Sequence, residues 1–440
     1  MTLQRRDFLK RGAGLVAASL VVPTFLAETA RMLDSTPAIT PSGLATAGGL
    51  IGIGSQLLNM QGVGSQPAAD TSKRIMVVLL LAGGNDGINT LIPYDDPLYY
   101  QARPSLAVPR EQVLTLNDAV GLSPALRHLK ARYDAGQVAV VQGVGYPNPN
   151  RSHFRAMDIW QTGVPERIEQ TGWLGRYLQA CACGTDKHLE GISLGTSVQK
   201  SFWTELTLVP AISNLAAFQY GSARTNPDAR QYEVEALRRA LNDARGRPEE
   251  EFLRQATRIA LDDADTLSQV AASYQTPITY PQGQLGESMK TIAQVIAGDV
   301  GTRVFFATLG GFDTHANQSG QQQRLLTELD GSIEAFMQDI ERLKRQDDVM
   351  VMTFSEFGRR VNENASNGTD HGTAEPLFMV GGGVKGGLHG AYPSLTDLDR
   401  GDLKFTTDFR SVYSSVLQGW MGVPSEQILG GVYPTLPLVA

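Results

Sequence analysis

The sequence is poor in cysteine, and this scarcity limits how the fold is stabilised. Only two cysteines, Cys181 and Cys183, occur in 440 residues. One intervening residue is a strained spacing for a disulfide, so we expect no disulfide framework and favour two small, buried side chains. A thiolate metal site needs more ligands than this pair supplies.

Basic charge is also in deficit, and this argues against one class of partner. The chain carries 38 basic and 45 acidic residues, a formal net charge of −7. Removing residues 1–30 takes away four basic and two acidic residues, so the net charge becomes −9. An acidic mature protein is a poor candidate for binding nucleic acid, and we expect no nucleic-acid partner.

Residues 35–69 lack charged side chains altogether and are rich in Gly, Ser, Ala, Thr and Pro. This composition predicts a flexible linker over residues 31–73. Its apolar stretch GLIGIGSQLLNMQGVG could instead pack on the domain or on a partner.

The first 30 residues resemble an export signal. Arg5 and Arg6 stand in QRRDFLK, and sixteen uncharged, mostly apolar residues follow at 12–27. A twin arginine before Phe-Leu-Lys resembles the Tat signal, whose cargo crosses the membrane folded, so we expect the Tat translocase as a partner and a periplasmic or extracellular location. An ordinary Sec signal or a membrane anchor is the alternative, although Pro23 weakens the anchor.

Residues 74–440 show even composition and no repeat, which predicts one α/β domain with insertions. Between its strands, residues 321–345 repeat apolar side chains every three or four positions, as an amphipathic helix does. Residues 228–273 read as a helical insertion broken at Gly246 and Pro248. Alternating strands and helices predict a doubly wound, mostly parallel sheet with helices on both faces. The expected strands are continuously apolar runs at 75–81, 138–144, 304–309, 349–354 and 377–380.

Several polar residues follow these apolar runs, at the sheet edge where α/β proteins keep their chemistry. Asp86 follows the first run in GGNDG; a solvated turn is the alternative for it. Asp313 and His315, in GFDTH, combine a carboxylate and an imidazole, which suits Zn, Mn or Fe, while Asp also suits Mg or Ca. An isolated histidine, however, is often a packed or surface residue.

Two further segments supply ligand types. Glu356 in FSEFG is a candidate carboxylate ligand, with Arg359 nearby to bind an anionic oxygen; an ion pair between them is the alternative. Asp370 and His371 are adjacent in a glycine-containing turn before an apolar strand, which favours a functional role. His389, in GGLHGAYP, is a weaker candidate.

The segment 147–163, PNPNRSHFRAMDIWQTG, supplies a candidate nucleophile. Ser152, flanked by Arg151 and His153, adjoins the start of an expected helix, where backbone N–H groups favour an anion and help activate a hydroxyl. A plain N-cap serine is the alternative.

Together these segments resemble the DUF1501 family of Tat-exported bacterial proteins, through RRDFLK, LAGGNDGINTLIP, NRSHFRAMDIWQTG, GFDTHANQ, SEFGR and TDHG. The resemblance implies an alkaline-phosphatase-like fold of the phosphatase and sulfatase superfamily, in which two metal ions lie beside a nucleophile. It implies Asp86 as the first ligand and Ser152 at the nucleophile position.

The resemblance leaves the remaining ligands open between two registers. In the register that we favour, Glu356 replaces the usual Asp-His pair and His371 is the last histidine. In the other, Asp370-His371 is the pair and His389 is the last ligand. The spacing of Asp313 and His315 also departs from the superfamily pattern.

The expected function is therefore an exported, metal-dependent hydrolase of small anionic phosphate or sulfate esters. Its divalent ions are expected to be Zn, Mn, Ca or Mg. A non-catalytic exported protein of the same fold, which binds a metal, a glycan or a protein partner, is the alternative. The expected catalytic residues are Arg151, Ser152, His153 and Arg359, and the expected metal ligands are Asp86, Asp313, His315, Glu356, Asp370 and His371.

Overall fold

The computed structural model describes residues 73–181, 189–204, 209–215, 227–243 and 248–440. The predicted signal peptide and all but the last residue of the predicted linker lie outside these ranges. Among the helices that the structure describes, none combines the length and the apolar character needed to cross a membrane.

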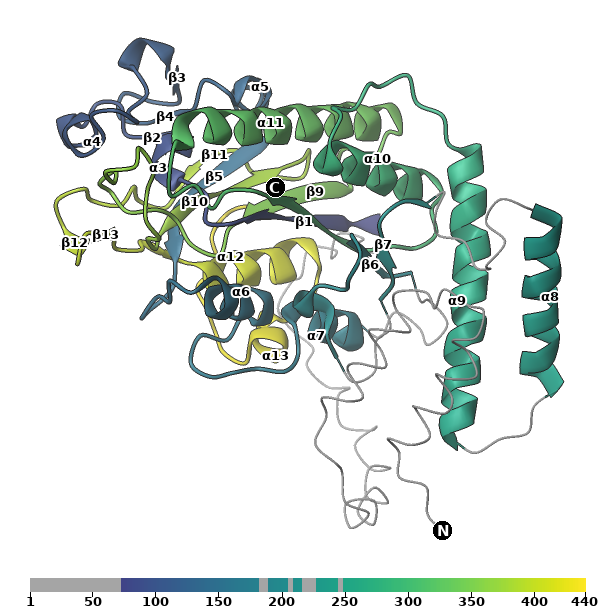
Figure 1. Cartoon of the computed structure of the whole chain (residues 1–440). Helices are drawn as coiled ribbons and strands as arrows, with labels where there is room; N and C mark the ends of the chain where they lie inside the picture. Colours follow the sequence, from purple (N-terminus) through teal and green to yellow (C-terminus); the bar gives the residue numbers. More distant parts are fainter. Residues whose placement is uncertain (1–72, 182–188, 205–208, 216–226, 244–247) are drawn as a thin grey trace, which may run out of the picture. The chain divides into compact units, whose positions relative to one another are not determined.

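A nine-stranded sheet forms the centre of the domain, in the order β11-β5-β10-β9-β1-β8-β6-β7, with β14 paired to β5 (Figure 1). Among the described strands of this sheet, β10 alone runs against its neighbours, and the other pairings are parallel. The predicted mostly parallel sheet is therefore confirmed. The strands are β1 (Ile75–Ala82), β5 (Val138–Gly145), β6 (Gly191–Leu194), β7 (Ala211–Ile212), β8 (Val304–Gly310), β9 (Val349–Phe354), β10 (Glu375–Val380), β11 (Gly387–His389) and β14 (Thr407–Asp408).

Side chains alternate along each buried strand, so each strand presents apolar side chains to both faces of the sheet. Helices cover both of these faces. From β1, Val77 and Leu79 enter one apolar core, and Met76 and Val78 enter the other. Figure 1 shows the two helical layers on opposite sides of the sheet. One contains α5 (Arg127–Asp134), α10 (Gln284–Ala297) and α11 (Gln318–Arg342), and the other contains α6 (His153–Thr162), α7 (Trp173–Ala180), α12 (Phe409–Ser415) and α13 (Ser425–Leu429).

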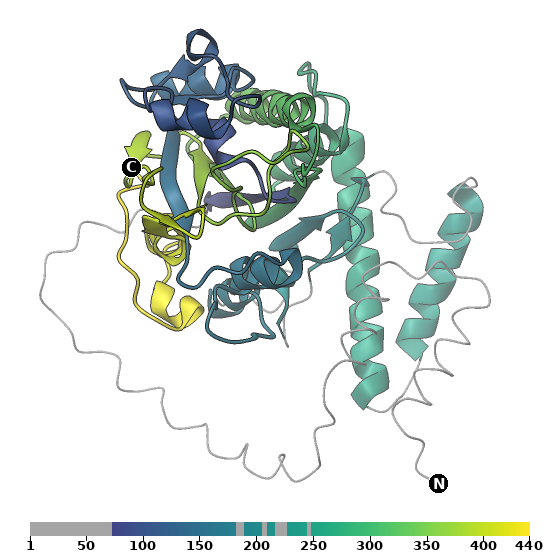
Figure 2. The ribbon, with the colours of Figure 1, turned by 60° about the vertical axis from the view of Figure 1, so that its left-hand side comes forward.

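The predicted helical insertion consists of two helices, α8 (Pro227–Asp243) and α9 (Pro248–Ser273). Figures 1 and 2 show α8 running alongside α9. Arg238 of α8 forms ion pairs with Asp262 and Asp265 of α9. On its other side α9 packs against α10, and Leu267 is fully buried in the core there. The helix pair is thus attached to the sheet through α10.

Smaller elements flank the sheet, among them α3 (Gly87–Thr90), α4 (Pro97–Ala102), the 3₁₀ helix η4 (Lys200–Phe202) and a three-stranded sheet of β2 (Leu91–Ile92), β3 (Leu114–Thr115) and β4 (Gly121–Leu122). Cys181, just after α7, is partly exposed and disulfide-bonded. The expectation of two unbonded, buried cysteines was therefore wrong for Cys181.

One edge of the sheet gathers the segments that carry the polar motifs. β1, β5, β8 and β9 point the same way, so their carboxyl ends meet at this edge, and the antiparallel β10 begins there. Residues that are widely separated in the sequence are thereby brought together, as expected for the carboxyl edge of an α/β sheet.

Candidate metal centre

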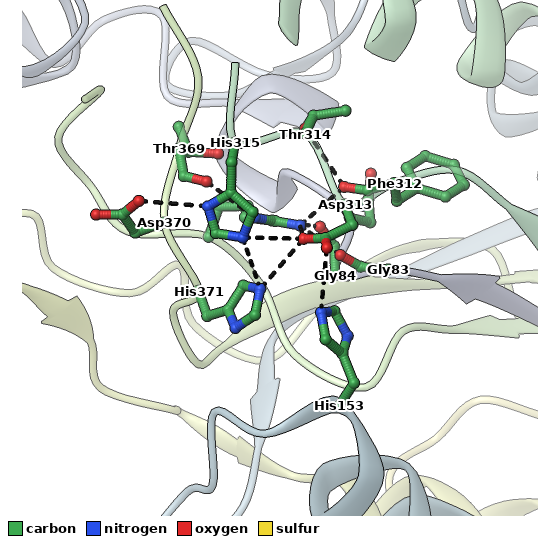
Figure 3. Close-up of polar contacts among 12 residues, drawn as sticks. Gly83, Gly84, His153, Phe312, Asp313, Thr314, His315, Thr369, Asp370 and His371 are labelled. Carbon is green, nitrogen blue, oxygen red and sulfur yellow. Dashed lines mark hydrogen bonds and ion pairs between the residues drawn. The ribbon is translucent and has the colours of Figure 1, made fainter. Parts of the chain in front are cut away.

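Four side chains meet at this edge, with Asp313 at their centre. Oδ1 of Asp313 lies 3.0 Å from Nε2 of His315 and 3.2 Å from Nε2 of His371. Its Oδ2 lies 3.5 Å from Nε2 of His153. Ligand atoms of His153, Asp313 and His371 all lie within 4.8 Å of one another. Figure 3 shows the three imidazole rings turned toward the Asp313 carboxylate; below, these four residues are called the His₃Asp cluster.

Glycine allows the segments to approach closely enough to form this cluster. Gly83 follows β1 with a φ of +118°, and a Cβ on it would lie 2.4 Å from the backbone nitrogen of Asp313. Only glycine fits both that conformation and that contact. The diglycine after β1 thus lets the segment after β8 pass next to it.

Each histidine of the cluster turns its Nδ1 toward an oxygen acceptor. Nδ1 of His153 lies 2.7 Å from Oε1 of Glu356, and Nδ1 of His371 lies 2.9 Å from the carbonyl oxygen of Arg151. Nδ1 of His315 faces Oδ1 of Asp370 at 3.4 Å. Carbonyl and carboxylate oxygens only accept hydrogen bonds, so these contacts place the proton on Nδ1 and leave the Nε2 lone pairs facing Asp313.

The Nε2 atoms need a cation between them. Those of His315 and His371 are 2.9 Å apart, so two lone pairs face each other when both Nδ1 atoms carry the proton. Nε2 of His153 is buried and has no hydrogen-bond partner in the described part of the chain. A divalent ion held by His153, Asp313 and His371, with His315 adjacent, would satisfy these lone pairs, and a set of imidazoles and one carboxylate suits Zn, Mn or Fe. The residues present therefore fit a metal ion.

The surroundings of Asp313 favour the ionised form of its carboxylate. Partial burial favours its neutral form, but the hydrogen bond and the positive charge of Arg359 act in the opposite sense and hold the pKa of Asp313 below its usual value. Burial lowers the pKa of His371 below its usual value, although its hydrogen bond to the carbonyl oxygen of Arg151 acts in the opposite sense. A charged carboxylate and a neutral imidazole are the forms that bind metal ions.

Glu356 and Asp370, two of the predicted ligands, lie behind the histidines instead of among the four. Glu356 is 2% exposed and also accepts a hydrogen bond from the backbone nitrogen of Gly83, at 2.9 Å. Asp370 accepts a bond from Asn364 as well as facing His315. Carboxylates at this position orient metal-binding histidines and raise their basicity.

Asp86, the other predicted ligand outside the cluster, has different partners. It is completely buried, and its Oδ2 forms an ion pair with Arg103 and accepts a hydrogen bond from Gln318. It also caps the start of α3 by accepting from the backbone nitrogen of Asn89. Asp86 is therefore not among the cluster residues, and a buried guanidinium neutralises its charge.

Arg359 is not available to a substrate. It is 1% exposed and donates to Asp313 and to backbone carbonyl oxygens of the segments that surround the cluster. Those carbonyls belong to Gly83, Gly84, Phe312 and Thr369. Arg359 therefore does not contact an ester, contrary to the prediction from the sequence, but holds the Asp313 carboxylate in position.

Arg151 and Ser152 lie beside the cluster on the segment that enters α6. The carbonyl of Arg151 holds His371, while its side chain forms an ion pair with Asp402 and stays 34% exposed. Ser152 is exposed and precedes α6, but its side chain makes no capping hydrogen bond. The plain N-cap explanation of Ser152 therefore does not apply.

Sequence reasoning missed the ligand position of His153, which it grouped with the catalytic residues. The signal was present, because a histidine at the first position of a helix after a parallel strand faces the same edge as the other motifs. His389 lies apart on β11, where its Nε2 contacts the carbonyl of Lys385. The register that ends at His389 is therefore not the one the fold assembles.

Comparison with known proteins identifies a family. The family model described as "Protein of unknown function (DUF1501)" matches residues 139–429. No curated protein matches the sequence significantly.

Several solved structures are similar to this chain at low sequence identity. The C-terminal periplasmic domain of EcEptC from Escherichia coli, in complex with Zn, is 10% identical to this chain. The match covers 72% of this chain and 74% of the EcEptC chain, with a TM-score of 0.35. The lipoteichoic acid synthase LtaP from Listeria monocytogenes is 9% identical, with coverages of 84% and 78% and a TM-score of 0.36. The PsFucS1 sulfatase from Pseudoalteromonas sp. is 10% identical, with coverages of 82% and 70% and a TM-score of 0.35.

Proposed function

The chain belongs to the DUF1501 family, and we propose that it is an exported, metal-dependent hydrolase of phosphate or sulfate esters. The observation that carries the proposal is the His₃Asp cluster. Three Nε2 atoms converge on one ionised carboxylate, and each Nδ1 faces an oxygen acceptor. This arrangement has the chemistry of a divalent metal site that is open to solvent, since the side chain of Asp313 is 48% exposed.

A bound divalent ion would polarise the ester and favour the deprotonated form of an attacking hydroxyl. The chain's own residues orient the reactants. Ser152 precedes the ligand His153 directly, so its exposed hydroxyl is the candidate nucleophile. Arg151 adjoins both, and its partly exposed guanidinium is the candidate to neutralise the oxygens of the ester. Glu356 keeps His153 in the tautomer that turns Nε2 outward.

The proposal is tested by removing a cluster histidine and comparing it with a histidine outside the cluster. We expect His371→Ala to lose at least one equivalent of bound Zn²⁺ or Mn²⁺ and to abolish metal-dependent turnover of an aryl phosphate or aryl sulfate. His389→Ala is the matched control and should retain both. Elemental analysis and a chromogenic assay measure the two properties. Turnover that persists in His371→Ala would refute the assignment.

A second candidate, a non-catalytic metal-binding protein of the same fold, is favoured by one observation. Asp86 interacts with Arg103 and Gln318, and Glu356 interacts with His153, so two of the predicted carboxylate ligands are already engaged by other side chains of the protein. The same experiment separates the candidates. Stoichiometric metal without hydrolysis of any phosphate or sulfate ester would favour the binding protein.

A further inference from the structure

A hollow of about 330 Å³ lies next to the His₃Asp cluster. It lies between one face of α6 and Lys200 of η4. The helical residues lie at positions that share a face, because residues three or four apart are neighbours on a helix. The lining residues are His153, Phe154, Met157, Asp158, Gln161 and Lys200.

Phe154 gives this hollow an unusual surface. Its side chain is 91% exposed, although the other side of α6 buries Ile159 and Trp160 in the core. A large aromatic ring that is left in water loses the free energy that burial supplies, and such a ring stacks readily on another flat, apolar face. Met157 on the next turn adds a second, adaptable apolar contact.

The hollow is also lined by polar residues, among them Asp158 and Lys200. Lys200 forms an ion pair with Asp158, which also pairs with Arg155. An ammonium group has three donors, so Lys200 can pair with Asp158 and still donate to a ligand. The hollow therefore combines two apolar side chains, those of Phe154 and Met157, with a hydrogen-bond donor, Lys200.

His153 joins the hollow to the cluster. It is one of the lining residues of the hollow, and its Nε2 lies 3.5 Å from Oδ2 of Asp313. A ligand whose acidic group binds at the cluster can therefore extend its remaining part along α6 without leaving the protein surface. Phe154 and Met157 line the same hollow as His153.

We propose that this hollow binds the alcohol part of the ester, and that this part is a ring with an apolar face that stacks on Phe154 and a polar edge toward Lys200. The inference rests on the proposed function, because it takes the acidic group of the ester to bind at the cluster. A ring of either aryl or sugar origin has the required chemistry.

Binding of non-hydrolysable analogues tests the subsite without depending on turnover. The full chain, loaded with Zn²⁺, is titrated calorimetrically with methylphosphonate, phenylphosphonate and glucose 6-phosphonate. We expect at least one ring compound to bind the wild type about tenfold more tightly than methylphosphonate does. Phe154→Ala should reduce this preference to about twofold or less and leave methylphosphonate binding unchanged. Phe154→Trp should restore it, and Tyr232→Ala, which removes another exposed ring, should have no effect.

The outcomes distinguish failure of the proposed ring subsite from failure of the proposed anion-binding metal centre. If Phe154→Ala keeps the preference for a ring, or the wild type has none, the subsite is refuted while the cluster stands. If the Zn²⁺-loaded wild type binds none of the three phosphonates, the anion-binding centre is refuted and the subsite with it. The ring compound that binds more tightly identifies the aryl or the sugar source.

Discussion

Each imidazole of the His₃Asp cluster depends on one oxygen atom behind it. Glu356 is the best placed of these, because it is nearly fully buried and its Oε1 lies 2.7 Å from Nδ1 of His153. A buried carboxylate holds an imidazole more firmly than an exposed one, since water does not compete for the same bond. The orientation of His153 is therefore decided by a residue that does not face the metal position.

At the residue scale we predict that Glu356→Gln weakens metal binding without removing a ligand. The amide keeps the shape of the side chain but accepts a weaker hydrogen bond from His153, or donates to it and reverses the tautomer. Loss of such a partner typically lowers metal affinity about 10- to 100-fold. Competition with a fluorescent zinc chelator measures the affinity.

The exposed Glu287→Gln is the matched control for this change, since it lies in the first turn of α10. It should bind zinc as the wild type does. An unchanged zinc affinity in Glu356→Gln would show that Glu356 does not support His153.

Some cluster residues could be predicted from the sequence, and the reason is local. Asp313 and His315 follow β8 directly, and His371 stands just before β10, so strand positions alone place them at one edge. Asp86 also follows a strand, but Arg103 neutralises it, and a partner 17 residues away leaves no signal in the motif around Asp86. The sequence indicates where a carboxylate lies on the fold, but not whether it binds a metal ion or pairs with a distant arginine.

At the element scale, the pair of Asp86 and Arg103 connects several segments around the site. Asp86 caps α3 and accepts from Gln318 of α11, while Arg103, just after α4, donates to the carbonyls of Arg360 and Val361. Both charged side chains are fully buried. The elements around the cluster are thus held together by charges that are shielded from water.

We therefore predict that Asp86→Ala lowers the free energy of unfolding by about 3–5 kcal/mol, because it leaves the Arg103 guanidinium buried without its partner. The folded fraction should still bind the wild-type equivalent of zinc. Urea denaturation and metal analysis of the folded protein measure the two effects. Asp134→Ala, which breaks the exposed pair with Lys130, is the control and should change stability by about 1 kcal/mol or less.

The result also tests the earlier assignment of Asp86. If the folded Asp86→Ala protein lost its metal while its stability stayed near that of the wild type, Asp86 would be a ligand after all.

The long elements could be predicted more fully than the short ones. All five expected strands are present, and β9 has the bounds that its apolar run predicts. The strands β6, β7, β11 and β14 were not predicted, because segments of two to four residues are too short to show periodicity. The reversed direction of β10 was not predicted either, since a continuous apolar run carries no information about direction.

At the scale of the whole molecule, the prediction concerns export. We propose that the chain leaves the cytoplasm through the Tat translocase after it has folded and acquired its metal, because folding before export lets the cell control which ion enters the site. Replacing Arg5 and Arg6 together with lysine should leave folded, metal-loaded protein in the cytoplasm. Cell fractionation and metal analysis of the cytoplasmic protein measure this outcome.

A chain with only Arg11 replaced by lysine is the control and should be exported normally. Normal export of the variant that lacks both arginines, or its export by a route for unfolded chains, would contradict the proposal.

The central position of β1 has a consequence for how the protein comes into being. β1 is the first strand of the domain to be synthesised, yet both of its neighbours come late, with Met76 paired to Val304 and Ile75 paired to Val349. A nascent chain must therefore expose an apolar strand through most of its translation before either partner emerges. Pairings between such distant segments fold slowly and leave a chain prone to aggregation. We expect the unfinished polypeptide to need a chaperone at the ribosome until β9 has been made.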